Sequence, residues 1–400
     1  MPALRIALFS RATPAHHPAG GMERHTDQLA RGLARRGHAV TVFTTALPPA
    51  AAPDAGEPGL EFRYLAGTHP GAYRGGYWRR SRTAFAAEQA AQAFDAILSQ
   101  SAGAWGALEL PAGERPPCLA VLHGSTGGEL ATAWRSRPLS PRTWVKTALG
   151  LHYDALNRRR LPRCAALVAV SAAVAGRLAR EYPAQAAALR VIPNGVDTAG
   201  WSPADPAASR LVLYAGRVIA EKGIFVLLEA FARIAGAEPH WLLRIVGGGE
   251  LAALRARVVR LGLGERVEVL GALPHARMGE HYGAAALLAL PTLRDEGLPL
   301  SVLEAMACGL PVLAVARGGL GEAVRDGEEG VLLDRAEAGA LAIALGRLIA
   351  APAERARLGR AARARAEAIF SETAMLAAYG ACLAELTGRG ESQPLPGSRR

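Results

Sequence analysis

The sequence predicts an α/β protein built from two doubly wound parallel-sheet domains that face each other across a cleft. Its 400 residues suit two domains, and half of them are hydrophobic, which is enough to build large cores. Short β-rich runs alternate with helical segments, as parallel sheets require. The alternation stops at a stretch rich in turn residues and then starts again, which indicates two similar units joined by a hinge.

The first unit is expected to span residues 1–195. A helical segment rich in leucine and arginine follows the first β-rich run of this unit. The unit ends at the turn pair Asn194-Gly195, preceded by Pro193, and prolines at 203 and 206 follow shortly after it. Its β-rich runs are 5–10, 38–45, 94–99, 118–123 and 165–171.

The second unit is expected to span residues 196–370, with helices beginning near 223, 250 and 299. Its β-rich runs are 211–216, 241–249, 266–271, 286–292 and 311–315. A last helix, 371–386, is expected to pack back on the first domain. Residues 387–400 are predicted to form a disordered tail.

Composition favours a cytoplasmic enzyme. The first residues lack a cleavage site for a signal peptide, and no apolar stretch is long enough to cross a bilayer. The four cysteines, at 118, 164, 308 and 382, are too scattered for a metal or redox motif, so we expect reduced core thiols and no bound metal. Nucleic acid is not an expected partner, because no nucleic-acid module accompanies the arginines.

The positive charge is concentrated in the first half of the chain. Residues 1–200 hold 23 Lys and Arg against 13 Asp and Glu, a net +10, whereas residues 201–400 hold 23 against 22, a net +1. The excess indicates an anionic partner, either a membrane surface or an acidic acceptor. The stretch 134–160, with two tryptophans and seven basic residues, could make peripheral contact with an anionic membrane, or it could be an ordinary solvated helix pair.

Loops that follow strands of the second unit carry candidate binding groups, because ligands of open α/β sheets lie at the carboxyl ends of the strands. Gly216, Arg217 and Lys222 follow one run and precede a helix, which brings two cations and a helix N-terminus to one place. That combination favours a diphosphate. The glycines Gly247 and Gly248 let the backbone approach a ligand, and Leu270 is expected to line the same pocket.

The stretch 296–311, EGLPLSVLEAMACGLP, places two carboxylates eight residues apart. Pro299 is expected to be the first residue of a helix and Gly309 to end it. Glu296 then lies in the loop beside the amides of Gly297 and Leu298, and Glu304 lies in the second helical turn. Carboxylates accept hydrogen bonds from sugar hydroxyls, so the pair could hold the two ends of one ligand. The alternative is that Glu304 is the satisfied partner of a buried arginine or amide.

Two features of the first unit complete the candidate site. Gly21 precedes a helix, where its amide could face an anion, and His123 ends a strand at the mouth of the cleft. A lone histidine is more often structural than catalytic, so these residues alone leave the role of His123 open.

The motifs in order resemble the retaining glycosyltransferases of family 4, which have the GT-B fold of two Rossmann-like domains. They are GGMERHTDQLARGLARRGHAVTV, LHG, VIPNGVD, GRV and KG around Arg217 and Lys222, VGGG, and EGLPLSVLEAMACGLPV. The likeness covers residues 4–386, and the Glu296 to Glu304 spacing is its most specific part.

The resemblance implies transfer of a sugar from a nucleotide diphosphate, a UDP- or GDP-sugar, to a hydroxyl of a lipid-linked, polysaccharide or other glycan acceptor. It implies retained configuration and neither cofactor nor obligatory metal. Arg217 and Lys222 would stabilise the diphosphate, Glu296 would contact the donor sugar and Glu304 the ribose. Gly21 would donate its amide to the diphosphate, and His123 would approach the reacting sugar.

This chain departs from the common family pattern after the first glutamate, where Gly297-Leu298-Pro299 replaces a Gly-Phe-Gly run. Two other functions are compatible with part of this pattern. A sugar-nucleotide epimerase would bind a similar donor in a similar cleft, and a non-catalytic nucleotide-sugar or glycan-binding protein would keep the fold alone. The spacing of the glutamates and the Arg217 and Lys222 pair favour the transferase.

Overall fold

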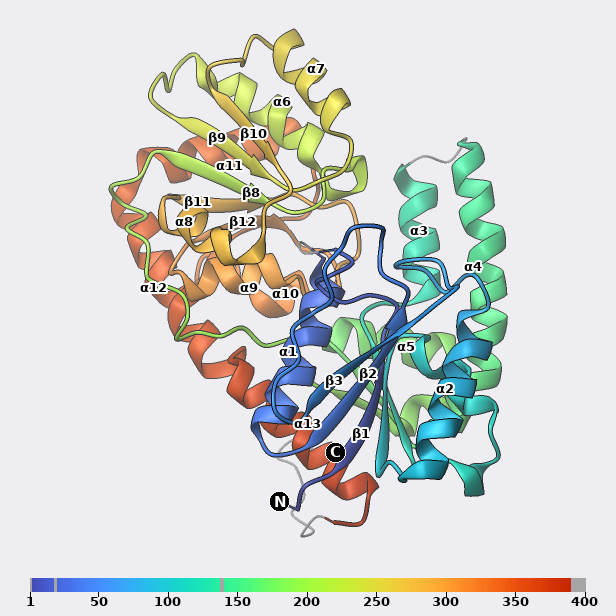
Figure 1. Cartoon of the computed structure of the whole chain (residues 1–400). Helices are drawn as coiled ribbons and strands as arrows, with labels where there is room; N and C mark the ends of the chain where they lie inside the picture. The colour runs from blue at the N-terminus through green and yellow to red at the C-terminus, as the bar shows by residue number, and fades with distance from the viewer. Residues whose placement is uncertain (1, 18–19, 137–139, 390–400) are drawn as a thin grey trace.

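The protein consists of two α/β domains packed side by side (Figure 1). The computed structural model describes residues 2–17, 20–136 and 140–389. The first domain contains a seven-stranded sheet and the second a six-stranded sheet, and the paired strands of both sheets run parallel. Helices on both faces bury such sheets, which is why their central strands read as continuous apolar runs.

The two sheets repeat one strand order. The first is ordered β3-β2-β1-β4-β5-β6-β7, and the second β10-β9-β8-β11-β12-β13. The first-sheet strands are β1 (Arg5–Phe9), β2 (Ala39–Thr45), β3 (Leu60–Leu65), β4 (Ala96–Gln100), β5 (Cys118–Leu122), β6 (Ala166–Ala169) and β7 (Leu189–Val191). The second-sheet strands are β8 (Leu211–Ala215), β9 (Leu242–Val246), β10 (Val267–Gly271), β11 (Leu287–Leu290), β12 (Val312–Val315) and β13 (Gly330–Leu333).

Helices connect the strands and cover the sheets. In the first half they are α1 (Gly21–Arg35), α2 (Tyr77–Ala91), α3 (Thr126–Ser136), α4 (Pro141–Arg160) and α5 (Ala172–Glu181). In the second half they are α6 (Ile224–Ala235), α7 (Leu251–Arg260), α8 (Met278–Gly283), α9 (Leu300–Ala307), α10 (Leu320–Ala323), α11 (Ala338–Ala350), α12 (Pro352–Ile369) and α13 (Glu372–Leu386). Figure 1 shows α3 and α4 standing as a hairpin at the side of the first domain.

The fold confirms the predicted pair of parallel-sheet domains, and each predicted β-rich run contains a strand. The strands that the sequence pattern missed are β3, β7 and β13, and each lies at the edge of its sheet. Their residues are mostly half-buried or exposed. An edge strand contacts one neighbour only, so it carries no continuous apolar run that would mark it in the sequence.

The chain crosses between the domains twice, at neighbouring places. Val196 donates its amide to the Phe370 carbonyl, and Glu372 donates its amide to the Val196 carbonyl. After the second crossing α13 packs on α1 of the first domain, where Leu376 occupies the space that a side chain at Gly32 would need. Figure 1 shows α13 lying beside α1.

The carboxyl end of the chain is described as far as residue 389, and α13 ends at Leu386. Most of the tail that the sequence predicts to be disordered, residues 390–400, lies outside the described residues. Within the described part of the chain, none of the helices combines the length and the apolarity that a bilayer-crossing segment needs. The four cysteines are free thiols.

Candidate functional site

The candidate site lies where two topological switch points face each other. In the first sheet the strand order reverses between β1 and β4, and in the second between β8 and β11. The loops after such a pair of strands diverge and leave a crevice for a ligand. A cavity of about 280 Å³ opens there between the domains. Its first-domain lining is Gly21, Met22, Arg24, His123, Val170 and Asn194.

Glu296 is a buried and ion-paired side chain of the second-domain wall. It follows β11 and is 8% exposed, with Lys222 Nζ at 2.7 and 2.8 Å from its two oxygens and Thr292 Oγ1 at 2.8 Å. Burial would raise its pKa, but the neighbouring Lys222 ammonium, helped by Thr292, holds the pKa below the ordinary value. Glu296 is therefore a carboxylate that can accept hydrogen bonds from a ligand.

The loop that carries Glu296 is fixed by its backbone. Gly319 donates its amide to the Glu296 carbonyl at 2.9 Å. Gly318 has φ +57°, and a Cβ there would lie 2.0 Å from the same carbonyl oxygen. A glycine is needed because any side chain would push the loop away.

Glu304 sits deeper, on the second turn of α9, as the sequence predicts. It accepts hydrogen bonds from Tyr282 Oη at 2.8 Å and His275 Nε2 at 3.1 Å, and it forms an ion pair with Arg24 of α1. Burial would raise its pKa, yet Arg24, His275 and Tyr282 lower it below the ordinary value. Arg24 reaches Glu304 from the other domain, so this ion pair ties the two walls together.

The ends of α9 match the prediction except at its first residue. Pro299 is extended and caps the helix, which begins at Leu300 rather than at Pro299. The difference arises because the Leu298 carbonyl turns away to accept a hydrogen bond from Asn194 Nδ2 at 2.7 Å, across the domain interface. At the other end Gly309 has φ +72°, and Leu310 donates its amide to the Ala305 carbonyl, a Schellman motif.

The predicted diphosphate loops lie side by side at the carboxyl ends of β8 and β9. Gly216 donates its amide to the Val246 carbonyl, and Val218 donates to the Gly248 carbonyl. A Cβ at Gly247, which has φ +147°, would lie 1.8 Å from the Gly216 carbonyl oxygen, so the close approach requires glycine. Gly216, Arg217, Gly247 and Gly248 all line the cavity. Arg217 is exposed, so its guanidinium is accessible to an anion.

The first-domain wall meets the second at Gly297. A Cβ on Gly297 would lie 2.2 Å from the backbone carbonyl oxygen of His123, so these two residues are in direct backbone contact. Gly21 begins α1, where the first amides of a helix are free of intrahelical partners. The N-terminus of α1 therefore faces the cavity from the first domain.

The cavity brings together the predicted residues except one. Leu270 is 40% exposed, and it is Leu273 that lines the cavity. The pairing of β10 with β9 shifts register between Val269 and Gly271, which turns Leu270 outward. The sequence reading also missed Arg24, His275, Tyr282 and Asn194. Arg24 and Asn194 belong to quoted motifs but were not assigned to the site, whereas His275 and Tyr282 gave no local signal.

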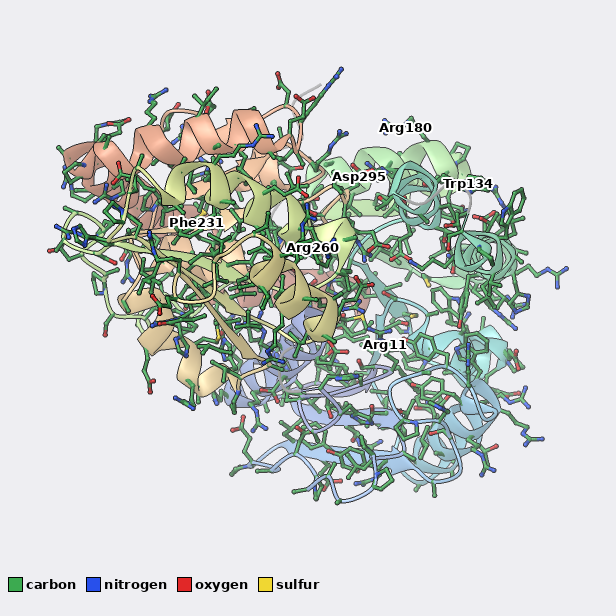
Figure 2. The ribbon with its side chains drawn as sticks, turned by 90° about the horizontal axis from the view of Figure 1, so that it is seen from above. Arg11, Trp134, Arg180, Phe231, Arg260 and Asp295 are labelled. Carbon is green, nitrogen blue, oxygen red and sulfur yellow. The ribbon has the colours of Figure 1, made fainter. Side chains whose placement is uncertain are left out.

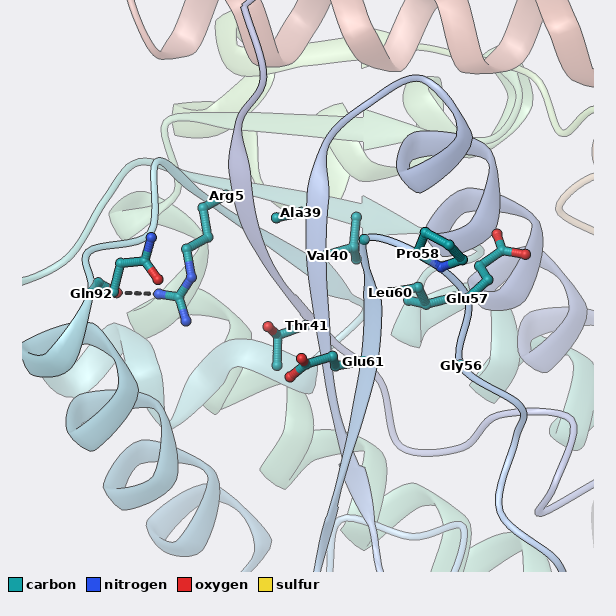
Figure 3. A pocket seen from close by; sticks show the side chains of 11 residues that line it. Arg5, Ala39, Val40, Thr41, Gly56, Glu57, Pro58, Leu60, Glu61 and Gln92 are labelled. Carbon is teal, nitrogen blue, oxygen red and sulfur yellow. Dashed lines mark hydrogen bonds between the residues drawn. The ribbon is translucent and has the colours of Figure 1, made fainter.

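A second hollow, of about 580 Å³, lies at the opposite end of the first sheet, lined in part by Arg5, Gln92, Glu57 and Glu61 (Figure 3). It is larger, but it adjoins the amino ends of β1 and β2. Arg5 already bonds the Gln92 carbonyl there, and Glu57 pairs with Arg31. Carboxylates without free cations do not suit a diphosphate, so the interdomain cavity is the candidate site.

Comparison with known families finds one matching family model in each half of the chain. The model described as "Glycosyltransferase Family 4" matches residues 19–199, and the model described as "Glycosyl transferases group 1" matches residues 201–365. The two matches meet near residue 200.

Relatives match over most of the chain. A D-inositol 3-phosphate glycosyltransferase of Streptomyces scabiei is 30% identical over 93% of this chain and 89% of its own length. A GDP-mannose-dependent alpha-(1-6)-phosphatidylinositol monomannoside mannosyltransferase of Mycolicibacterium smegmatis is 34% identical over 44% of this chain and 51% of its own length. Among solved structures, a sucrose-phosphate synthase of Thermosynechococcus elongatus superposes with TM-score 0.81 and 25% identity, over 97% of this chain and all of that one.

Proposed function

The chain belongs to glycosyltransferase family 4, and we propose that it moves a sugar from a UDP- or GDP-sugar to a hydroxyl of a lipid-linked, polysaccharide or other glycan acceptor. It is a transferase, which sets aside the epimerase and the non-catalytic binding protein. The observation that carries the proposal is the Glu296 carboxylate held by Lys222 inside the interdomain cavity, at the switch point of the second sheet.

The cations at this switch point would meet the charge of the leaving diphosphate. Negative charge develops on the diphosphate as the sugar departs, and preorganised donors stabilise it better than water can. Arg217 supplies an accessible cation, Lys222 supplies a second that is shared with Glu296, and the free amides at the start of α1 face the same cavity. We therefore propose that neither a metal nor another cofactor is required, because the chain itself provides the positive charge.

Glu304 is suited to hold the ribose. A carboxylate offers about four lone-pair positions, of which Arg24, His275 and Tyr282 take three. One position remains for a ribose hydroxyl. Glu296 would bind the donor sugar at the other end, with the amides of Gly297 and Leu298 nearby.

The acceptor would approach from the first domain, on the side of His123. We propose retention of configuration, with attack on the face that the diphosphate leaves. The relatives' names mention inositol phosphate and a phosphatidylinositol mannoside, which supports an anionic or lipid-linked acceptor. The net +10 of residues 1–200 points the same way.

The hairpin of α3 and α4 supports contact with the inner face of a membrane. Trp144 and Leu151 are both 61% exposed and lie seven residues apart, on one face of α4. Val145 is 60% exposed on the adjoining row. The positive charge is smaller than the sequence suggests, because Arg158 pairs with Asp154 and Arg160 with Glu109. Residues 137–139 of the predicted stretch lie outside the described residues.

Vesicle co-sedimentation tests this surface. The protein should bind phosphatidylglycerol-containing vesicles, and the double change Trp144→Ser with Leu151→Ser should abolish binding. Ile343→Ser is the control, since Ile343 is 77% exposed on α11 of the other domain. Equal binding by all three proteins, or binding that ignores anionic lipid, would remove the membrane part of the proposal.

A donor screen tests the core of the proposal. A ligand that binds only the native state raises its stability, so one of UDP-, GDP- or ADP-sugars should raise Tm. Lys222→Ala should abolish that rise, whereas Arg260→Ala should keep it, because Arg260 is exposed on α7 and does not line the cavity. With the donor known, proton NMR of the product reports its anomeric configuration, and turnover should survive EDTA. No Tm rise with any of the three donor classes would contradict the proposal.

A further inference from the structure

A chain of hydrogen bonds runs behind the first-domain wall and ends at His123. His123 Nε2 lies 2.7 Å from Gln100 Oε1, and Gln100 Nε2 lies 3.1 Å from His25 Nδ1. Gln100 and His25 are each 1% exposed, whereas His123 reaches the cavity. The three residues come from β4, α1 and the end of β5, so they meet at the switch point of the first sheet.

The side-chain amide of Gln100 has an oxygen that accepts hydrogen bonds and an NH₂ group that donates them. Its contacts with His123 and His25 therefore assign a tautomer to each ring. Its oxygen can only accept, which requires a proton on His123 Nε2, and its NH₂ can only donate, which requires a lone pair on His25 Nδ1. Neutral imidazole carries one donor and one acceptor, so His123 Nδ1 is then an acceptor. Among the described residues Nδ1 has no hydrogen-bond partner, and it is left for a ligand in the cavity.

The position of Gln100 is itself held in an unusual backbone. The next residue, Ser101, has φ +50°, a left-handed conformation that a non-glycine residue adopts only when its surroundings impose it. Ser101 donates its amide to the Val121 carbonyl at 2.8 Å, and its own carbonyl accepts from Ser99 Oγ. Tyr73 Oη donates to the Gln100 carbonyl at 2.9 Å. Strained backbone conformations of this kind cluster at functional sites, where a side chain needs a fixed orientation.

The groups that face His123 keep it uncharged. Burial lowers its pKa to about 4, and the Arg11 guanidinium, on the loop after β1, lowers it in the same direction. His25 lies edge-on at 4.8 Å between ring centroids and is itself neutral, because burial holds its pKa well below the ordinary value. From α13, Tyr379 contacts the His25 ring. From the second domain, Arg217, Lys222 and Glu296 line the same cavity.

We infer that Gln100 is a positioning residue, which fixes His123 as a neutral ring protonated on Nε2 so that Nδ1 accepts a hydrogen bond from a hydroxyl of the donor sugar or the acceptor. The inference rests on the proposed transferase reaction. The inference adds Gln100, which touches no substrate, to the residues that serve the reaction. It also means that His123 Nδ1 acts only as a hydrogen-bond acceptor. His25 Nδ1 accepts from the other end of the same amide, which places the proton of that ring on Nε2, a buried atom without a hydrogen-bond partner among the described residues.

The ¹⁵N spectrum of the histidines tests the tautomer without any turnover. The wild-type protein should show His123 protonated on Nε2, with no titration of that ring above pH 5; His123→Gln assigns the signal. Gln100→Met keeps the volume and removes both hydrogen bonds, so the ring should lose its single tautomer. Tyr379→Phe is the control, because the Tyr379 hydroxyl is buried without a hydrogen-bond partner among the described residues. Protonation on Nδ1 in the wild type, or an unchanged tautomer in Gln100→Met, overturns the inference.

Kinetics give the second readout. Gln100→Met should lower kcat about tenfold while the donor still raises Tm, whereas Tyr379→Phe should keep kcat. In Gln100→Glu the carboxylate would raise the pKa of His123. Below that pKa the ring is charged and Nδ1 donates, and above it the ring is neutral and Nδ1 accepts. Activity of Gln100→Glu should therefore recover as pH rises from 6 to 9, and a profile equal to that of the wild type overturns the inference. If no donor supports turnover, the proposed function fails while the NMR result still decides the inference.

Discussion

The two walls of the cleft have the same strand order and opposite chemistry. On the second-domain wall, Glu296 and Glu304 are buried and ionised, since Lys222, Arg24 and their hydrogen-bond donors lower the pKa values that burial would raise. On the first-domain wall, the buried His25 and the half-buried His123 are neutral, since loss of solvent around the rings lowers their pKa values and no carboxylate offsets it. Burial removes charge only where no counter-charge is supplied.

This contrast assigns different tasks to the two walls. Paired charges on the second wall suit a ligand that is itself charged, such as a nucleotide diphosphate. A neutral network on the first wall suits hydroxyl groups, whose hydrogen bonds do not change with pH in the physiological range. The ion pair between Arg24 and Glu304, the hydrogen bond from Asn194 to the Leu298 carbonyl and the backbone contact between Gly297 and His123 each join the two walls. Three substitutions and a change of pH test the separate roles of the two walls, in order from the largest expected effect to the smallest.

Glu296→Gln should have the largest effect, because it removes the charge that orients Lys222 and meets the donor sugar. Losing one preorganised electrostatic group at a reacting centre costs about 10²–10³ in kcat. Steady-state turnover with the identified donor measures it. Glu329→Gln is a matched control, since Glu329 is also buried and paired with an arginine, at the amino end of β13. A Glu296→Gln enzyme with near wild-type kcat would show that the charged wall is structural.

Gly297→Ala should separate the walls. The Cβ of the alanine would lie 2.2 Å from the His123 carbonyl oxygen. Overpacking of this kind typically costs about 1–3 kcal/mol, and here the cost would disfavour the conformation in which the two domains are in contact. We expect kcat/KM to fall about ten- to hundredfold while each domain stays folded by circular dichroism. Gly321→Ala is the control, because a Cβ there meets no atom within 4 Å. Equal activity of the two variants would mean that the backbone contact is dispensable.

Arg24→Met should weaken donor binding without removing any proposed contact to the diphosphate. Glu304 would keep Tyr282 and His275 but lose the cation that holds it ionised and ties the domains together. We expect KM for the donor to rise about tenfold, the equivalent of about 1.4 kcal/mol. Arg177→Met breaks another interdomain ion pair, with Asp295 at 3.0 Å, outside the residues that line the cavity. Figure 2 shows Asp295 where the second domain meets the helices of the first. A similar KM in both variants would mean that Arg24 only holds the two domains together and has no specific effect on donor binding.

As pH falls, the histidines of the first-domain wall should lower the unfolding free energy before the glutamates of the second-domain wall do. The folded pKa of His123, about 4, lies below its unfolded value of about 6.5, so the unfolded chain binds the proton first as pH falls. Each such histidine should remove about 1.4 kcal/mol of unfolding free energy per pH unit between those values. Urea unfolding at pH 7, 6 and 5 measures this slope.

His123→Asn isolates one contribution, because His16, His25 and His38 shift in the same direction. In His123→Asn, the unfolding free energy should fall less steeply with decreasing pH than in the wild type, by the contribution of one histidine. Glu296 and Glu304 have lowered pKa values, so their stabilisation is fully present above the ordinary pKa of a glutamate and is lost only as pH falls through their lower folded values. A flat stability between pH 7 and 5 would mean that His123 is solvated.

The sequence alone was enough to establish the two domains, the central strands of both sheets and the loops that carry the site. Apolar runs and glycine and proline positions are local signals, and they depend on burial on both faces of a strand or on a required backbone angle. The spacing of Glu296 and Glu304 placed one carboxylate before α9 and the other within it, because the glycine and proline pattern limits where that helix can begin and end. The edge strands β3, β7 and β13 escaped because half-exposed strands carry no such pattern.

The tertiary structure decided which groups meet. Arg24 and Glu304 are 280 residues apart, and Gln100 joins two histidines that are 75 and 23 residues away from it. Leu273 takes the place expected for Leu270 because of a register shift in β10 that no pattern announces. Which pKa rises or falls also depends on these partners, since burial and counter-charge act in opposite directions and only the folded chain brings them together.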